Sequence, residues 1–164
     1  MQGHRLAIRI LGVSPTSHGF AFVVSERPDQ LLDWARHRTG ERRTLRIRLD
    51  HVVSESRPLF VACEIERNRC SRRGREFNGA LRGVCARYGI MILCVERRLV
   101  WTAGRGDRPA TDYQIARVAA DRFPEIADKL PKPRRAWNGS DDRIGVLLAA
   151  ELARAGWSHF RRPH

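Results

Sequence analysis

The chain has 164 residues, 42% of them apolar, so we expect one domain over residues 1–156 followed by a mobile basic aromatic tail over residues 157–164. Its formal net charge of +13 comes almost entirely from arginine, which makes nucleic acid the first candidate partner and a polyanionic membrane surface a distant second. No Cys-x-x-Cys pair, histidine cluster, secretion signal or apolar run of about 20 residues occurs, which argues against zinc, disulfides and a membrane span and favours a cytoplasmic location.

Two apolar runs, residues 6–13 and 20–24, open the chain and are joined by a polar, turn-forming segment. This pattern predicts a β-hairpin. Only Arg9 and Gly12 interrupt the first run, which is typical of a central strand covered on both faces. Ser14 follows that run and should lie near the middle of the molecule, where it either belongs to a site or caps the turn.

The next two elements are predicted from their spacing. Residues 31–35 indicate a third strand, which would complete an antiparallel meander, or the start of a short helix. Residues 41–56 predict a basic amphipathic helix, because apolar residues recur at helical spacing opposite several arginines. Those arginines either contact phosphate or form the solvated face of a surface helix.

A buried strand is predicted over residues 58–66, ending in Glu64 and Glu66 on one face. A buried carboxylate is costly unless a cation or hydrogen bonds compensate it, so Glu64 is informative. The alternative is that the strand has already reached solvent at Glu64.

A basic connection over residues 67–75, with a candidate helix cap at Ser71, leads to a helix that stops at Gly89. Residues 90–95 then predict another buried strand. Strand, helix and strand in this order make a parallel crossover unit. The expected fold class is therefore α/β: a mixed five-stranded sheet with an antiparallel three-stranded meander and flanking helices.

The last third of the chain begins with a glycine-rich basic segment, residues 97–109, which includes Trp101. A capping box at residues 111–114 predicts the next helix, and residues 129–135 form a proline-broken basic loop. Residues 140–142, a serine and two aspartates, open the final apolar helix, where the aspartates Asp141 and Asp142 either belong to a site or stabilise the first helical turn.

In this strand order, the ends of the first strand and of the Glu64 strand can be neighbours, with the start of the last helix over them. Carboxylates that converge from two strands and one helix can hold two Mg²⁺ ions about 4 Å apart for phosphodiester hydrolysis. Mg²⁺ requires hard oxygen ligands, which Asp and Glu supply.

Several segments together resemble the RuvC-type Holliday junction resolvases, which belong to the RNase H-like superfamily. The segments are ILGVSPTSHGFAFVV, LFVACEIE, ARYGIMILCV, KLP and DDRIGVLLAAELA, and the resemblance covers roughly residues 6–153. It implies an RNase H-like fold, a dimer, Mg²⁺-dependent cutting of branched DNA and a basic face for the junction arms.

Residue by residue, the resemblance places Glu64 at the family's central glutamate and Asp142 at the aspartate before the last helix, with Asp141 as a substitute for the neighbouring ligand position. At the family's first aspartate this chain has Ser14, in GVSPTS rather than a motif like GIDPGS. A serine hydroxyl is a poor Mg²⁺ ligand, which favours a degraded metal site. Weak replacement candidates are Glu66 and His18, the latter otherwise an ordinary surface histidine.

Three functions remain open. The first is a nucleic-acid-binding protein, for branched or duplex DNA or alternatively RNA, with a degraded site and no cofactor. The second is an active endonuclease dependent on Mg²⁺ or Mn²⁺. The third is a non-catalytic subunit of a nucleoprotein assembly that binds other proteins through segments around Trp101 and Trp157. The expected assembly is a homodimer or a subunit of a nucleoprotein complex.

Arginine suits phosphate because its guanidinium donates in a fixed fork and stays charged, although a coding bias explains the preference over lysine equally well. In the resemblance, family lysines fall at Trp101 and Asp112. The candidate nucleic-acid contacts are Arg67, Arg69, Arg72, Arg73, Arg75, Arg97, Arg98, Trp101, Arg105, Arg108, Arg134 and Arg135.

Overall fold

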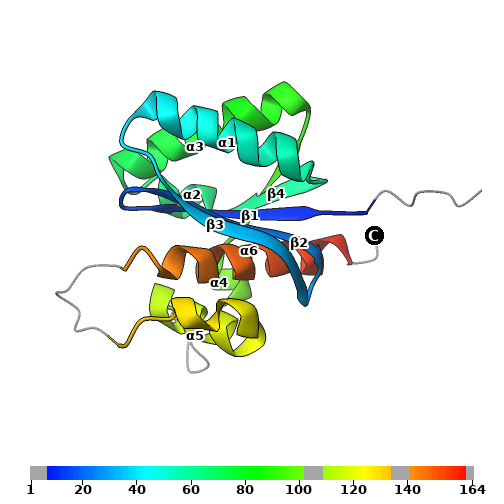
Figure 1. Ribbon diagram of the computed structural model, residues 1–164, viewed down its shortest axis with the longest axis vertical. Helices are drawn as coiled ribbons and strands as arrows, with labels where there is room; N and C mark the ends of the chain where they lie inside the picture. The colour runs from blue at the N-terminus through cyan, green and yellow to red at the C-terminus, as the bar shows by residue number, and fades with distance from the viewer. Residues whose placement is uncertain (1–6, 102–108, 134–140, 162–164) are drawn as a thin grey trace, which may run out of the picture.

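A five-stranded mixed sheet forms the centre of the protein in the computed structural model, which describes residues 7–101, 109–133 and 141–161 (Figure 1). The strand order is β3-β2-β1-β4-β5, with β1 antiparallel to β2, β2 antiparallel to β3, and the pairs β1/β4 and β4/β5 parallel. The predicted sheet and its meander are confirmed. The strands are β1 (Ile10–Thr16), β2 (Gly19–Arg27), β3 (Gln30–Arg38), β4 (Phe60–Cys63) and β5 (Met91–Cys94).

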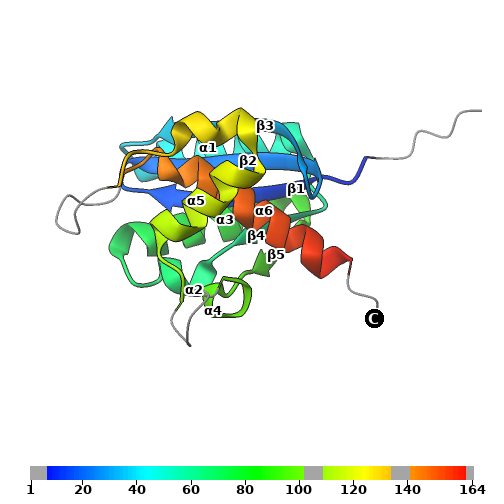
Figure 2. The ribbon, with the colours of Figure 1, turned by 90° about the horizontal axis from the view of Figure 1, so that it is seen from below.

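Helices cover both faces of the sheet. One face carries the first two long helices, and the other carries the last two and a 3₁₀ turn (Figures 1 and 2). Two short helices sit in connections that follow β4 and β5. The helices are α1 (Arg42–Ser56), α2 (Ile65–Asn68), α3 (Arg72–Tyr88), α4 (Arg97–Val100), α5 (Asp112–Arg122), η1 (Pro124–Lys129) and α6 (Ile144–Phe160).

Strand β1 contacts both hydrophobic layers, as its apolar sequence predicts. Ile10 packs into the layer under α5 and α6, whereas Leu11 and Val13 pack into the layer under α1 and α3. Helix α6 crosses β1 so closely that a Cβ at Gly12 would overlap the carbonyl oxygen of Ala149. Gly12 therefore sets the distance between the last helix and the central strand.

Local signals place the helix ends correctly. Ser71 caps α3 by accepting a hydrogen bond from the Gly74 amide, and Gly89 ends that helix in the left-handed conformation. The capping box at Thr111 and Gln114 begins α5. These signals depend on a few neighbouring residues, which is why they can be read without the fold.

The strand expectations need two corrections. Strand β4 ends at Cys63 and the chain turns at once into α2, so Glu64 and Glu66 do not share a strand face. Strand β5 is the sheet's edge, and Met91 and Cys94 are exposed rather than buried. An edge strand has a neighbouring strand on one side only, so its side chains are less completely covered.

The end of the chain also differs from expectation. Helix α6 continues through Phe160, so the boundary at residue 156 falls inside a helix. Trp157 is buried, and its Nε1 donates a hydrogen bond of 2.7 Å to Oγ of Ser25 on β2. The expectation of a mobile tail is wrong for residues 157–160, because the indole has both an apolar pocket and a polar partner. Within the described residues, no helix is long and apolar enough to cross a membrane.

Candidate functional site

A cleft of about 520 Å³ opens at the carboxyl ends of β1 and β4. The parallel register pairs Gly12 with Ala62, so Ser14, further along β1, and Glu64, which directly follows β4, lie at the same edge of the sheet. The cleft is lined by both of these residues and by Asp141 and Asp142 at the start of α6. The predicted convergence of two strands and one helix is therefore present, and Ser14 is among the residues that line it.

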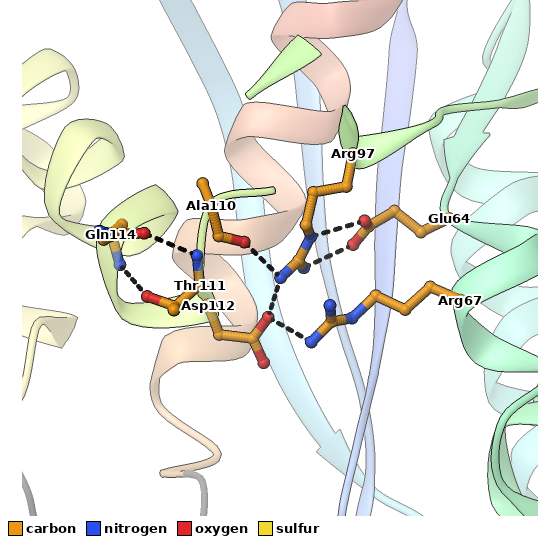
Figure 3. Close-up of polar contacts among 7 residues, drawn as sticks. All are labelled: Glu64, Arg67, Arg97, Ala110, Thr111, Asp112 and Gln114. Atoms are coloured by element: carbon orange, nitrogen blue, oxygen red, sulfur yellow. Dashed lines mark hydrogen bonds and ion pairs between the residues drawn. The ribbon is translucent and has the colours of Figure 1, made fainter. Parts of the chain in front are cut away.

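Glu64 is held by an arginine. Arg97 donates from Nε to Oε1 and from Nη2 to Oε2, both at 2.9 Å, in a bidentate pair (Figure 3). The two side chains are only 7% and 8% exposed. A buried carboxylate requires this kind of compensation, and the fork of the guanidinium matches its two oxygens.

The third nitrogen of the same guanidinium is also engaged. Nη1 of Arg97 lies 2.6 Å from Oδ1 of Asp112 and donates to the carbonyl oxygen of Ala110 at 3.2 Å (Figure 3). Burial alone would lower the pKa of Arg97, but the hydrogen bonds and negative charges of Glu64 and Asp112 outweigh it and raise the pKa. Asp112 also accepts a bond of 3.0 Å from Nη2 of Arg67. Two acids and two arginines thus form one ionic network.

Trp101 fixes the segment that carries Arg97. Its Nε1 donates to Oε2 of Glu151 at 3.2 Å, and Glu151 is fully buried within α6. Glu151 also accepts from Arg122 on α5 and from Arg154 one turn away on α6. The short helix α4 is therefore anchored through Trp101 to the last helix.

Asp142 holds the β1–β2 turn against the start of α6. Its Oδ1 accepts from the backbone amide of Ser17 at 3.1 Å and from the Ser17 hydroxyl at 2.5 Å, and its Oδ2 lies 3.2 Å from Nδ1 of His18. Asp141 binds Arg143, with Nη2 and Oδ2 at 2.7 Å. Both acids precede the helix, and neither lies in its first turn, where the sequence predicted them.

The donor set does not fit a pair of divalent metal ions. Ser14 offers no charge, Glu64 has both oxygens on Arg97, and Asp142 is bound by Ser17. Among the described residues, no group of three or more His, Cys, Asp and Glu side chains is arranged to hold a metal ion. Of the weak replacement candidates, Glu66 is exposed and pairs with Arg69, while His18 contacts Asp142.

Most of the arginines expected to contact nucleic acid, where described, are exposed. This holds for Arg67, Arg69, Arg72, Arg73, Arg75 and Arg98. Arg97 is instead buried in its ion pair, and Trp101 is buried rather than exposed because its indole packs and donates inward. The expected contacts Arg105, Arg108, Arg134 and Arg135 lie outside the described residues.

A second cleft, of about 290 Å³, adjoins the first around the β1–β2 hairpin. The two share Pro15, Thr16 and Arg73 in their walls. Arg42 at the start of α1 and Arg72 at the start of α3 line the second cleft. We call the two together the basic groove, since exposed arginines border it at both helix starts.

Sequence reasoning missed the part that Arg97, Asp112 and Glu151 play in this site. For Arg97 a signal existed, because the carboxyl ends of parallel strands meet at one edge of a sheet and a buried Glu64 needs a cation. Glu64 directly follows β4, and Arg97 is the third residue after β5. Glu151 falls on the apolar stripe of α6, which marks it as a buried acid.

Comparison with family models and with curated proteins finds no match for the chain. Among solved structures, the chain is similar to RuvC of T. thermophilus, in complex with a Holliday junction substrate, at a TM-score of 0.62 and 16% sequence identity. The alignment covers 96% of this chain and 99% of that one. This likeness shows the fold: the mixed sheet with flanking helices is RNase H-like, as the resemblance implies.

Proposed function

We propose that this protein binds branched or duplex DNA in the basic groove and does not cleave it. The observation that carries the proposal is that the acids lining the cleft are held by partners from the chain itself. Arg97 and Arg67 hold Glu64 and Asp112, Arg143 holds Asp141, and the β1–β2 turn holds Asp142. A cleft whose acids are held in this way presents the exposed Arg73 to phosphate and has no fitting place for the metal pair of a nuclease.

The charge distribution supports a phosphate-rich partner. The net charge is +13, and exposed arginines border the groove on α1, α2 and α3. Guanidinium groups that neutralise phosphates release counterions, so the affinity should fall steeply as salt rises. The similarly folded RuvC in complex with a Holliday junction substrate supports branched DNA as the first substrate to test.

The test compares a labelled four-way junction, a DNA duplex of the same arm sequence and an RNA duplex. Binding is followed by fluorescence anisotropy over a series of salt concentrations, and cleavage is scored on gels with Mg²⁺ or Mn²⁺. We expect salt-dependent binding, strongest for the junction, and intact strands. A size measurement of the complex then tests the expected homodimer.

Two arginines on the same helix make a matched pair of variants. Arg73 lines both parts of the basic groove, whereas Arg82, two and a half turns along α3, faces a separate apolar pocket near β5. Arg73→Ala should lower the slope of log affinity against log salt by about one phosphate contact, or ~0.9. Arg82→Ala should leave that slope unchanged. Equal effects would argue against the groove as the binding surface.

The cleavage assay decides between binding alone and the active endonuclease. Strand cutting by the unmodified chain that Glu64→Gln removes would overturn the proposal and identify a metal-dependent nuclease. If only the double variant Ser14→Asp/Arg97→Gln cuts the strands, the result would instead indicate a nuclease fold that is preserved while its metal site has been lost. Neither binding nor cutting would leave a protein-binding subunit as the remaining hypothesis.

A further inference from the structure

The Arg97 guanidinium is surrounded by oxygen atoms of the kind that surround a bound hard cation. Its donors meet two oxygens of Glu64, one of Asp112 and the carbonyl oxygen of Ala110, at 2.6 to 3.2 Å. A cradle of carboxylate and carbonyl oxygens is the kind of donor set in which proteins bind divalent cations. Here a side chain of the protein fills it (Figure 3).

The guanidinium cannot easily leave this position. The side chain is 7% exposed, and its backbone is joined to Trp101, whose amide donates to the Arg97 carbonyl oxygen at 2.8 Å. Trp101 is tied in turn to the fully buried Glu151. A divalent ion could therefore reach Glu64 only if this buried fork were first expelled, which would leave a charged arginine without its partners.

The placement has a consequence for nucleic acid. Carboxylates at the centre of a phosphate-binding cleft repel the phosphodiester unless a cation neutralises them. In this cleft Arg97 supplies that cation to both Glu64 and Asp112, and Arg67 adds a second charge on Asp112. The neutralising charge is covalently attached, so it does not depend on ions in solution.

We infer that Arg97 is the resident cation of this cleft: it takes the place of divalent metal beside Glu64 and Asp112 and makes phosphate binding independent of divalent ions. This inference deepens the proposed function and rests on it for the nucleic-acid part alone. The exclusion of metal is a property of the protein by itself, and it is measured without DNA.

The first experiment titrates the purified full chain with Mn²⁺, followed by electron paramagnetic resonance of the free ion and by calorimetry. We expect no saturable binding to the unmodified protein. Arg97→Gln should gain one Mn²⁺ site, because Glu64 and Asp112 lose their shared cation. Arg98→Gln removes the same charge from the exposed neighbour and should gain none.

The second experiment measures four-way junction affinity in EDTA and in Mn²⁺. The unmodified protein should bind the junction with the same affinity in both, to within about twofold, since no divalent ion takes part. Arg97→Gln should bind roughly tenfold more weakly in EDTA, the effect of one close unit charge, and should recover part of that loss in Mn²⁺. Failure to bind the junction at all would count against the proposed function and leave the Mn²⁺ titration valid.

A folding defect in Arg97→Gln does not remove the test. The double variant Glu64→Gln/Arg97→Gln has no buried charge at this pair and should bind no Mn²⁺. Saturable Mn²⁺ binding by the unmodified chain, lost in Glu64→Gln, would overturn the inference outright. So would a folded Arg97→Gln that gains neither a Mn²⁺ site nor a Mn²⁺-dependent recovery of junction binding.

Discussion

The buried pair of Glu64 and Arg97 makes a quantitative prediction about stability. Arg97→Met keeps much of the length of the side chain and removes its charge, which leaves the Glu64 carboxylate buried without its bidentate partner. Breaking a buried ion pair in this way costs about 3–5 kcal/mol. Both side chains are less than a tenth exposed, so solvent screening reduces this figure little.

The expected loss can be read as a shift in melting temperature. For a domain of this size, 1 kcal/mol lowers the Tm by about 2–4 °C, so Arg97→Met should lower it by roughly 6–20 °C. Differential scanning calorimetry measures the shift, and urea unfolding followed by circular dichroism checks the free energy. The double variant Glu64→Leu/Arg97→Met should recover most of the loss, because removing both charges removes the desolvation penalty.

An exposed ion pair is the control. Nη1 of Arg69 lies 3.1 Å from Oε2 of Glu66, and both of these side chains are exposed, so Arg69→Met should change the Tm very little. If Arg97→Met shifted the Tm no further than Arg69→Met does, the reasoning that the Glu64 pair is desolvated and structurally required would be refuted.

Four further predictions follow from burial and close packing. Iodoacetamide should alkylate the exposed thiols of Cys70 and Cys94 in the folded protein, and a bound four-way junction should slow the reaction at Cys70 alone, because Cys70 lines the cleft; equal protection of both would contradict the groove. Burial raises the pKa of Cys85 to about 11, so mass spectrometry should find it alkylated only after unfolding. Burial, followed by neighbouring cations, lowers the pKa of His37. The contribution of His37 to folding stability should be fully present above the ordinary histidine pKa of about 6.5 and be lost as the pH falls through the lowered pKa. His37→Asn should flatten this fall in Tm. Gly12→Ala should cost about 1–3 kcal/mol in urea unfolding, since the added methyl overlaps the backbone of α6; an unchanged midpoint would mean that α6 can move away from β1.

Much of the fold could be predicted because its signals are local. The apolar run of β1 indicates two covered faces, and the helical stripe in residues 41–56 corresponds to the buried side of α1, where Leu45 and Leu49 pack. The caps at Ser71 and Thr111 depend on residues three positions apart. Such features reflect backbone hydrogen bonding and periodicity, and tertiary contacts reinforce them here.

The site could be predicted only in part. The order of strands brings Ser14 and Glu64 together, and that order follows from the sequence pattern. The partner of Glu64 is Arg97, which lies 33 residues later in the sequence, after an edge strand. The position of Arg97 depends in turn on the hydrogen bond between Trp101 and Glu151, which are 50 residues apart. No local pattern encodes these pairings. The requirement that a buried carboxylate find a cation is the physical rule that narrows the search.

The late position of helix α6 in the chain affects how the protein folds during its synthesis on the ribosome. The strands that form the floor of the cleft are synthesised early, yet Asp142 and Glu151, which brace its rim and anchor Trp101, belong to the last described segment. Domains fold as units, and long-range contacts wait until both partners exist. Until α6 emerges, the nascent chain therefore has one face of the sheet uncovered and Arg97 unanchored, and the groove takes its final form only after α6 has been synthesised.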